Sequence, residues 1–423
     1  GGYGINYLGA YFGAIVNSGT FNILQGATVI DDLTNTGAFN NAGNYTAAVD
    51  NSTAGGVITN QSTGVWNGNV LSNTAGASIT NNGSWTGTLN STAIVNNNAG
   101  ATWNGAFTLG SGSVTTNAGT WTAGSATTSS ITNGDFTNSG TMNTGRIQVF
   151  GANGVFTNTS TGTVTIGGGN PLEAFTNAQI INNGVVNGVG GSGGGGSIAN
   201  NAGASWNGAI FVNAGGSLTN AGSVTGLITN NGVVTSTGSF TGGLSNNTGT
   251  TANLAGTANG AVNNSGLITV TGALTGNNTF SNSGAGQLLV SGGNYTGLTT
   301  ITNNSTAATG ISVSAGRTLG GTTITNNAGA TIVSAGTLST TSGITNSGTL
   351  TSTGAIVGAL TNNGVANLAG TFSFNLINQG AGAMTITGNL AGAGGGFSSS
   401  GTSTTTVSSG ATWSGVFNVV NAS

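Results

Sequence analysis

The chain contains 423 residues, of which 36% are hydrophobic and only 2% are charged, with a net charge of −3, whereas about a quarter of the residues in an ordinary soluble domain are charged. Its two cationic residues, Arg146 and Arg317, are too few to neutralise a nucleic-acid backbone or to hold the chain on an anionic membrane, so neither is expected as a partner. Cys and His do not occur, which excludes disulfides, Cys-based zinc sites and a Ser-His-Asp triad, and no apolar run reaches the roughly 20 residues of a membrane-spanning helix.

Residues 1–15, GGYGINYLGAYFGAI, precede the first repeat and are rich in Gly and Tyr. A stack of strands leaves unpaired backbone groups at its ends, and these groups need a cap or a partner. We therefore expect residues 1–15 to form an N-terminal capping or docking segment.

Residues 16–423 repeat one short phrase, an aliphatic residue or Phe followed by Thr or Asn, Asn, Gly and a second apolar run. Examples are ITNNGSWTG at Ile79, LTNAGSVTG at Leu218 and ITNSGTLTSTG at Ile344. The apolar residue that opens the phrase recurs about every 20 residues, which is the length of one turn of a β-solenoid. Such a unit cannot bury its apolar face alone and must stack on copies of itself. The pattern predicts a single continuous solenoid of roughly 20 turns.

Each repeat contains very short stretches that alternate polar and apolar residues, such as Ser84-Trp85-Thr86 and Thr349-Leu350-Thr351. This alternation is typical of strands with one buried face. Pro171 is the only Pro, and Lys, Glu and Arg, which favour helices, are nearly absent. The sequence therefore predicts an all-β fold, a parallel β-helix (β-solenoid) with about three strands per turn and almost no helix.

The polar residues of the repeat have specific expected places. Asn tolerates the left-handed backbone conformation of a corner, and its amide can bond the equivalent Asn one turn away, as in stacked parallel strands. Gly suits corners where φ is positive or another backbone packs closely. We therefore expect Asn ladders at the corners and Ile, Leu, Val and Phe in the interior.

One group of acidic residues is a candidate site. Asp32 and Asp50 are separated by about one turn, so they are expected on adjacent turns, with Asp31 beside them. Paired carboxylates are used by glycosidases and also bind Ca²⁺. The favoured alternative is that they are hydrated loop charges, which discourage edge-to-edge association.

The six Trp residues allow two interpretations. Four of them, Trp66, Trp85, Trp103 and Trp121, are spaced by about one turn and can stack in a file, as in aromatic ladders that bind sugars; the others are Trp206 and Trp413. Other repeats have Met142, Val234, Phe240 and Leu350 where these have Trp. Because exchange with aliphatic residues indicates burial, the core interpretation is favoured over a carbohydrate-binding face.

The Gly-rich segment 188–197 contains chance matches to two motifs. Gly188, Gly190 and Gly193 fit G-x-G-x-x-G, and Gly190, Ser192 and Gly194 fit G-x-S-x-G, but no strand-turn-helix context surrounds them. We expect a flexible loop, or a hinge between two solenoid blocks, at 188–197 and a similar flexible loop at 391–396. No catalytic, cofactor-binding or metal-binding residue is predicted, and the protein is not expected to be an enzyme.

The phrases ITNNGSWTGTL, FTNSGTMNTG, ITNSGTLTSTG and LTNNGVANLAG resemble the repeats of Gram-negative autotransporter passengers and filamentous haemagglutinin-like adhesins. The resemblance runs from Val16 to Val420 and implies a right-handed parallel β-helix that is extracellular, secreted or on the bacterial cell surface. It also implies a role in adhesion, aggregation or biofilm formation. Because such families share a scaffold and not a site, it assigns no functional residue.

Two functions remain open from the sequence. One is a surface adhesin or stalk whose uncharged faces contact surface glycans or sister molecules. The other is an extracellular filament subunit that stacks head to tail through open solenoid ends, a type of contact that does not close and therefore grows. In both cases the main expected partner is a second copy of the chain.

Overall fold

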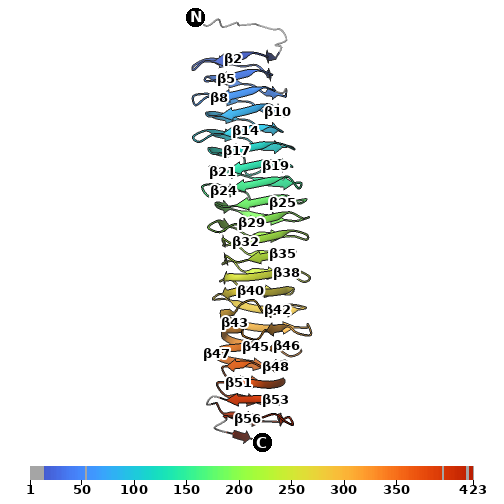
Figure 1. Ribbon diagram of the computed structural model, residues 1–423. Coiled ribbons are helices and arrows are strands. Elements are labelled where there is room, and N and C mark those ends of the chain that lie inside the picture. Colours follow the sequence, from blue (N-terminus) through green and yellow to red (C-terminus); the bar gives the residue numbers. More distant parts are fainter. Residues whose placement is uncertain (1–13, 53–54, 393–394, 416–418, 423) are drawn as a thin grey trace. The chain divides into compact units, whose positions relative to one another are not determined.

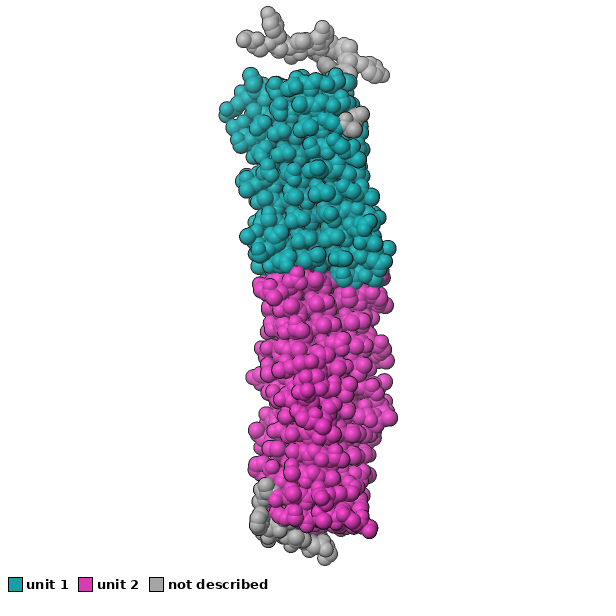
Figure 2. Space-filling model, viewed as in Figure 1, with its two compact units in different colours: residues 1–189, 195–197 teal, residues 190–194, 198–423 magenta. Residues whose placement is uncertain are grey.

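The computed structural model describes residues 14–52, 55–392, 395–415 and 419–422. These residues form strands, turns and bends, with no helix among them, and the parallel strands stack into a β-solenoid of about 21 turns with roughly 19 residues per turn (Figure 1). The predicted fold class is therefore confirmed. The chain divides into two compact units, residues 1–189 with 195–197 (unit 1) and residues 190–194 with 198–423 (unit 2) (Figure 2).

Unit 1 contains three parallel sheets, here called A, B and C. Sheet A consists of β1 (Ile15–Asn17), β4 (Leu33–Asn35), β7 (Val49–Asn51), β10 (Val70–Asn73), β13 (Leu89–Ser91), β16 (Phe107–Leu109), β19 (Thr128–Thr132), β22 (Arg146–Phe150) and β25 (Pro171–Phe175). Sheet B consists of β2 (Thr20–Ile23), β5 (Ala38–Asn41), β8 (Val57–Asn60), β11 (Ser78–Asn81), β14 (Ile94–Asn97), β17 (Val114–Asn117), β20 (Asp135–Asn138), β23 (Val155–Asn158) and β26 (Gln179–Asn182). Sheet C consists of β3 (Thr28–Val29), β6 (Asn44–Thr46), β9 (Val65–Asn67), β12 (Ser84–Thr86), β15 (Thr102–Asn104), β18 (Thr120–Thr122), β21 (Thr141–Thr144), β24 (Thr163–Ile166) and β27 (Val185–Asn187).

Unit 2 also contains three parallel sheets, D, E and F, and some of its strands belong to two of them. Sheet D consists of β28 (Val189–Ser192), β31 (Ile210–Val212), β34 (Ile228–Asn230), β37 (Leu244–Asn246), β39 (Val262–Asn264), β41 (Thr279–Gly284), the ends of β43 (Tyr295–Ser305), β45 (Thr318–Asn326) and β47 (Thr337–Asn346), then β50 (Leu360–Asn362), β52 (Leu376–Asn378), β54 (Phe397–Ser400) and β57 (Val419–Ala422). Sheet E consists of β29 (Ser197–Asn200), β32 (Ser217–Asn220), β35 (Val233–Ser236), the starts of β38 (Thr251–Ala258) and β40 (Leu267–Thr275), then β42 (Gln287–Val290), β44 (Ile311–Val313), β46 (Thr331–Ser334), β48 (Thr349–Ser352), the starts of β51 (Val365–Phe372) and β53 (Ala383–Gly392), and β55 (Thr404–Val407). Sheet F consists of β30 (Ser205–Asn207), β33 (Ser223–Val224), β36 (Ser239–Phe240), the ends of β38, β40, β51 and β53, the starts of β43, β45 and β47, and β49 (Ala355–Val357) and β56 (Trp413–Ser414).

Neighbouring turns pair in register because their side chains repeat. In sheet B, for example, Ile58 pairs with Ile79, which pairs with Val95 on the next strand. Side chains of a strand alternate between the interior and the outer face, and most interior positions hold apolar residues; Thr115, between Val95 and Phe136 in sheet B, is an exception. Each turn therefore adds one layer to a continuous core, as expected for stacked repeats.

Asn residues at the strand ends form ladders inside the solenoid, as predicted. In unit 1, the Nδ2 of each Asn donates to the Oδ1 of the next at 2.7–2.9 Å along Asn41, Asn60, Asn81, Asn97, Asn117, Asn138, Asn158 and Asn182. In unit 2, the same contact at 2.7–3.0 Å joins Asn230, Asn246, Asn264, Asn282, Asn303, Asn326, Asn346, Asn362 and Asn378. These side chains are buried, so each hydrogen bond also satisfies a polar group that has no access to water.

Each unit has one long ladder, which follows the strands of a single sheet. In unit 1 the long ladder ends the strands of sheet B, and a shorter one at the end of sheet A, Asn17, Asn35, Asn51 and Asn73, finishes on Ser91. In unit 2 the long ladder ends the strands of sheet D. Where a ladder stops, the same position is taken by buried apolar residues, as at Leu109, Ile131 and Val149 in sheet A.

Three predicted segments are placed as follows. Of residues 1–15, only 14 and 15 are among the described residues, and Ile15 begins β1. The expected loop at 188–197 is wrong in part, because β28 occupies Val189–Ser192. Gly190 of this strand packs against the indole of Trp206. A Cβ on Gly190 would be 2.4 Å from Cζ2 of that indole, so packing requires Gly there. Of segment 391–396, residues 391 and 392 end β53, 395 and 396 lie outside any strand, and 393–394 lie outside the described residues.

Candidate functional site

The four evenly spaced Trp residues form a stack in the core. Their ring centroids are 4.2 Å apart for Trp66 and Trp85, 4.7 Å for Trp85 and Trp103, and 4.9 Å for Trp103 and Trp121, and all three pairs are within 8° of parallel. None of the four side chains is exposed to solvent. On β9, β12, β15 and β18 of sheet C the Trp occupies the inward position between two outward residues, which are polar except for Val65 on β9, so in-register pairing stacks the indoles.

Three of the four indole N–H groups of this stack donate hydrogen bonds, and that of Trp66 is buried without a partner among the described residues. Nε1 of Trp85 donates to the carbonyl oxygen of Gly68, that of Trp103 to Gly87 and that of Trp121 to Gly105, at 2.9–3.1 Å. Each acceptor lies one turn earlier, at the corner that follows the preceding Trp. The prediction that these residues are core is confirmed, because no face of the stack is open to a sugar. Trp206 is also fully buried, whereas Trp413 is half-buried.

The residues that were predicted to share the Trp position do so only in part. Met142 pairs with Trp121, and Phe240 lies in sheet F, which also contains Trp206. Val234 and Leu350 are buried, but they belong to sheet E. The reason is that, within unit 2, Asn-rich corners with Gly precede both sheet E and sheet F, as before Val234 and before Trp206. The same phrase therefore occurs at two different corners.

The acidic residues are closely spaced but not aligned. Thr34 pairs with Asp50, and the backbone N–H of Ala48 donates to Oδ1 of Asp32 at 3.1 Å, so Asp32 and Asp50 lie on adjacent turns, offset by two positions. Asp31 accepts a hydrogen bond at its backbone oxygen from the Tyr45 hydroxyl. Burial, and then the charges of Asp32 and Asp31, raise the pKa of Tyr45 above its ordinary value. Within the described residues, no group of three or more acidic side chains converges as a metal site.

The structure adds one charged pair that the sequence did not predict. Arg146 on β22 donates from Nε to Oε2 of Glu173 on β25 at 2.8 Å. The two residues are 27 positions apart, which is longer than the average turn, so the repeat period alone does not align them. The pair is partly exposed and is expected to contribute little to stability.

Outward side chains distinguish the three faces of unit 1. The strands of sheet A carry Asp50, Arg146 and Glu173, and those of sheet B carry Asp135, whereas no described strand of sheet C carries a charged residue. The outer face of sheet C has two in-register columns of side chains. The first column is Asn44, Val65, Ser84, Thr102, Thr120, Thr141, Thr163 and Val185, and the second is Thr46, Asn67, Thr86, Asn104, Thr122, Asn143, Thr165 and Asn187.

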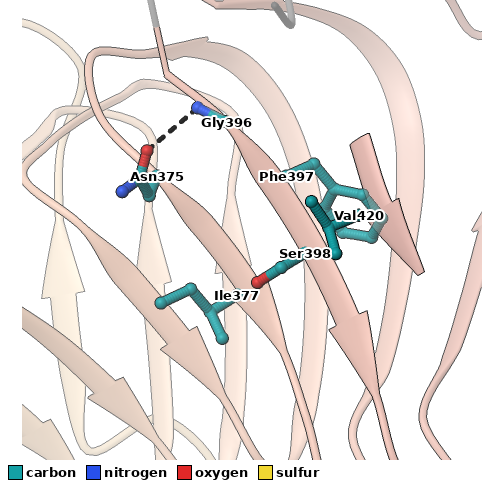
Figure 3. Close-up of a pocket in the computed structure, with 6 residues that line it drawn as sticks. All are labelled: Asn375, Ile377, Gly396, Phe397, Ser398 and Val420. Atoms are coloured by element: carbon teal, nitrogen blue, oxygen red, sulfur yellow. Dashed lines mark hydrogen bonds between the residues drawn. The ribbon is translucent and has the colours of Figure 1, made fainter. Parts of the chain in front are cut away.

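The surface depressions in the described part of unit 2 include the following two. One, of about 240 Å³, lies beside Phe397 and is lined by Asn375, Ile377, Gly396, Phe397, Ser398 and Val420, with the N–H of Gly396 donating to Oδ1 of Asn375 at 2.9 Å (Figure 3). Ile377, Ser398 and Val420 are successive outward residues of sheet D. The other lies where β43, β45 and β47 pass from sheet F to sheet D.

Comparisons with known proteins add no family to these observations. Among the described residues no helix is both long and apolar enough to span a bilayer. Neither a protein-family model nor a curated protein sequence matches the chain, so the resemblance to autotransporter passengers and haemagglutinin-like adhesins remains a prediction from the repeat phrases.

Proposed function

We propose that the chain is a non-enzymatic structural and adhesive protein of the bacterial cell surface, whose solenoid displays uncharged faces that bind sister molecules. The repeat phrases support this, because they resemble those of secreted adhesins. The composition supports it too, since a surface of hydroxyls and amides permits close approach of copies without the repulsion that charged faces produce.

The outer face of sheet C is the observation that carries the proposal. It is charge-free and regular, with hydroxyl and amide side chains repeated at the spacing of paired strands, about 4.8 Å. A second copy presents the same spacing, so contacts formed at one turn recur at the next. Asn amides and Thr hydroxyls each both donate and accept, which lets two such columns pair with one another. Repetition over many turns converts weak individual contacts into useful avidity.

The proposal is tested by placing negative charge on this face. Thr102→Glu with Thr163→Glu puts one carboxylate on β15 and one on β24, three turns apart. The matched control, Thr80→Glu with Thr137→Glu, puts the same charges on β11 and β20 of sheet B, also three turns apart. We expect the sheet C variant to weaken self-association by about tenfold or more, because like charges would face each other across the contact, and the control to change it little.

The measurement is sedimentation velocity of the purified chain over a range of concentrations, with aggregation of cells that display it as a second readout. A chain that stays monomeric at all concentrations, or equal weakening by both variants, contradicts lateral association through sheet C. Continuous filaments in electron micrographs, unchanged in the sheet C variant, support the alternative of head-to-tail stacking.

A further inference from the structure

The second depression of unit 2 is a groove that crosses three successive turns. It has a volume of about 310 Å³ and is lined by Thr296, Gly297, Leu298, Thr318, Gly320, Gly321, Thr322, Ser339 and Thr341, from β43, β45 and β47. Here the strands continue around the corner from sheet F to sheet D, and their pairing shifts register between Tyr295 and Leu298 and between Gly321 and Thr323. The groove is therefore a consequence of an irregular corner, and it is the size of a small ligand site.

Gly320 forms the bottom of the groove. It belongs to an outward column, between Thr296 on the preceding turn and Ser339 on the following one, and it has no side chain to fill its place. A Cβ built on Gly320 would have the Thr296 Cγ2 as its nearest neighbour, at 3.4 Å. On the other side the Ser339 Cβ would be 3.8 Å away, so an added Cβ makes ordinary van der Waals contact with both flanking residues, and the bare glycine leaves a shallow floor between two hydroxylated side chains.

The walls of the groove are uncharged and rich in unused hydroxyls. The side-chain oxygens of Thr296, Thr318, Thr322, Ser339 and Thr341 form no hydrogen bond with any described residue. The nearest cation in the sequence is Arg317, and its Nε donates to the backbone oxygen of Ser291 at 3.0 Å. Leu298 is only 2% exposed, so the floor of the groove is formed mainly by the glycines among its lining residues.

From this geometry we propose that the groove binds one ring of an uncharged polysaccharide. A pyranose ring presents hydroxyls at its rim and C–H groups on its faces, which matches Thr and Ser hydroxyls around a floor of glycines. Hydroxyls that both donate and accept suit a ligand with the same property. An anionic sugar would instead need a free cation, since a charged ligand that is desolvated without a partner binds poorly. The inference rests on the adhesive function proposed above and names its ligand class.

The test is titration of the full chain with cellotetraose, maltotetraose and chitotetraose, with tetragalacturonate as an anionic probe, followed by NMR or calorimetry. A single shallow subsite gives weak affinity, with a Kd of about 1 mM. We expect at least one of the neutral sugars to bind and tetragalacturonate not to bind. Failure of all three neutral sugars, or tighter binding of the anionic probe, would overturn the proposal without affecting the self-association test on sheet C.

Two variants locate the binding. Gly320→Thr fills the groove with the residue type that flanks it, and no left-handed φ at this position opposes the change; we expect at least a tenfold loss of affinity. Thr296→Val removes one hydroxyl and keeps the shape and strand preference of the side chain, and it should weaken binding by a few-fold even if Gly320→Thr folds poorly. Gly124→Thr in unit 1, where the nearest atom to a Cβ is 3.5 Å away, is the control and should bind normally. Unchanged affinity in both groove variants would contradict the assignment.

Discussion

Asn81 donates its amide Nδ2 to Oδ1 of Asn97 at 2.7 Å, and Asn97 in turn donates to Asn117 at 2.7 Å. Every amide of this ladder points in the same direction along the chain. Hydrogen bonds arranged head to tail polarise one another and so strengthen the series. The ladder therefore joins turns through side chains in the same way that the strands join them through the backbone.

Replacing one member of the ladder should destabilise the solenoid. Asn97→Ala removes the partner of the Asn81 amide and leaves the Asn117 Oδ1 buried without its donor, so we expect the free energy of unfolding to fall by about 1–3 kcal/mol. Asn104→Ala, on the exposed face of sheet C, is the control and should stay within about 0.5 kcal/mol. Urea denaturation measures both, and similar effects of the two variants would rule out a special role for the ladder.

The Trp stack should report on the integrity of the core. Trp103→Ala removes a buried indole that stacks on both Trp85 and Trp121, and we expect a loss of about 3–5 kcal/mol. Stacked indoles also couple their electronic transitions, so the near-ultraviolet circular dichroism signal should fall by more than one isolated Trp contributes. The half-buried Trp413 is the comparison, and its replacement by Ala should reduce the signal only by its own contribution.

The glycine corners that follow Trp66, Trp85 and Trp103 should not accept a side chain. A Cβ on Gly105 would lie 1.9 Å from the carbonyl oxygen of Gly87, which itself accepts from Trp103. The atoms that this Cβ would meet belong to the backbone of Gly87 and Thr88 and cannot rotate away. Gly105→Ala is therefore expected to lower the free energy of unfolding by about 1–3 kcal/mol, which is measured as a lower melting temperature. At Gly124 the nearest atom would be a methyl group at 3.5 Å, so Gly124→Ala should be neutral, and a comparable loss there would contradict the packing argument.

Stability should fall in strong alkali because of a buried hydroxyl. Burial raises the pKa of Tyr295 above its ordinary value of 10.0, and the Asn278 side chain offsets part of the rise. The folded state therefore keeps this proton while the unfolded state loses it above pH 10, so stability is constant below that pH and decreases above it. At pH 11 the loss should be on the order of 1 kcal/mol.

Tyr295→Phe isolates this effect. The variant should show a smaller decrease in urea midpoint between pH 9 and pH 11 than the parent protein. Phe280→Leu, which alters a ring that contacts Tyr295, is the control, because it should lower stability at both pH values and leave the dependence on pH unchanged. An identical pH dependence in Tyr295→Phe and the parent would show that another group is responsible.

The sequence predicted the features that depend on repetition. The strand phrases, the burial of Trp66 to Trp121 and the Asn ladders follow from side-chain alternation and from a period of about one turn. These are local rules that each repeat obeys by itself.

Features that depend on the length of an individual turn could not be predicted from the repeat phrases. The offset between Asp32 and Asp50, and the pairing of Arg146 with Glu173, are set by the residues that a particular corner inserts. The assignment of Val234 to the Trp position failed because the Asn-Gly phrase is used at two corners. The groove at Gly320 arises from register shifts at one corner, which no repeat phrase encodes.

The one-directional amide ladder of unit 1 also has a consequence for how the gene can change. Each Asn side chain of the ladder bonds the Asn before it and the Asn after it, as well as nearby backbone groups, and each Trp of the stack lies against the Trp of a neighbouring turn. Removal of residues 82–97 would bring Asn81 to Asn117 and Trp66 to Trp103, so the long ladder and the Trp stack would stay continuous, whereas Asn73 would meet Leu109 in place of Ser91. Insertion or deletion of whole turns is therefore the change in chain length that alters the core packing least.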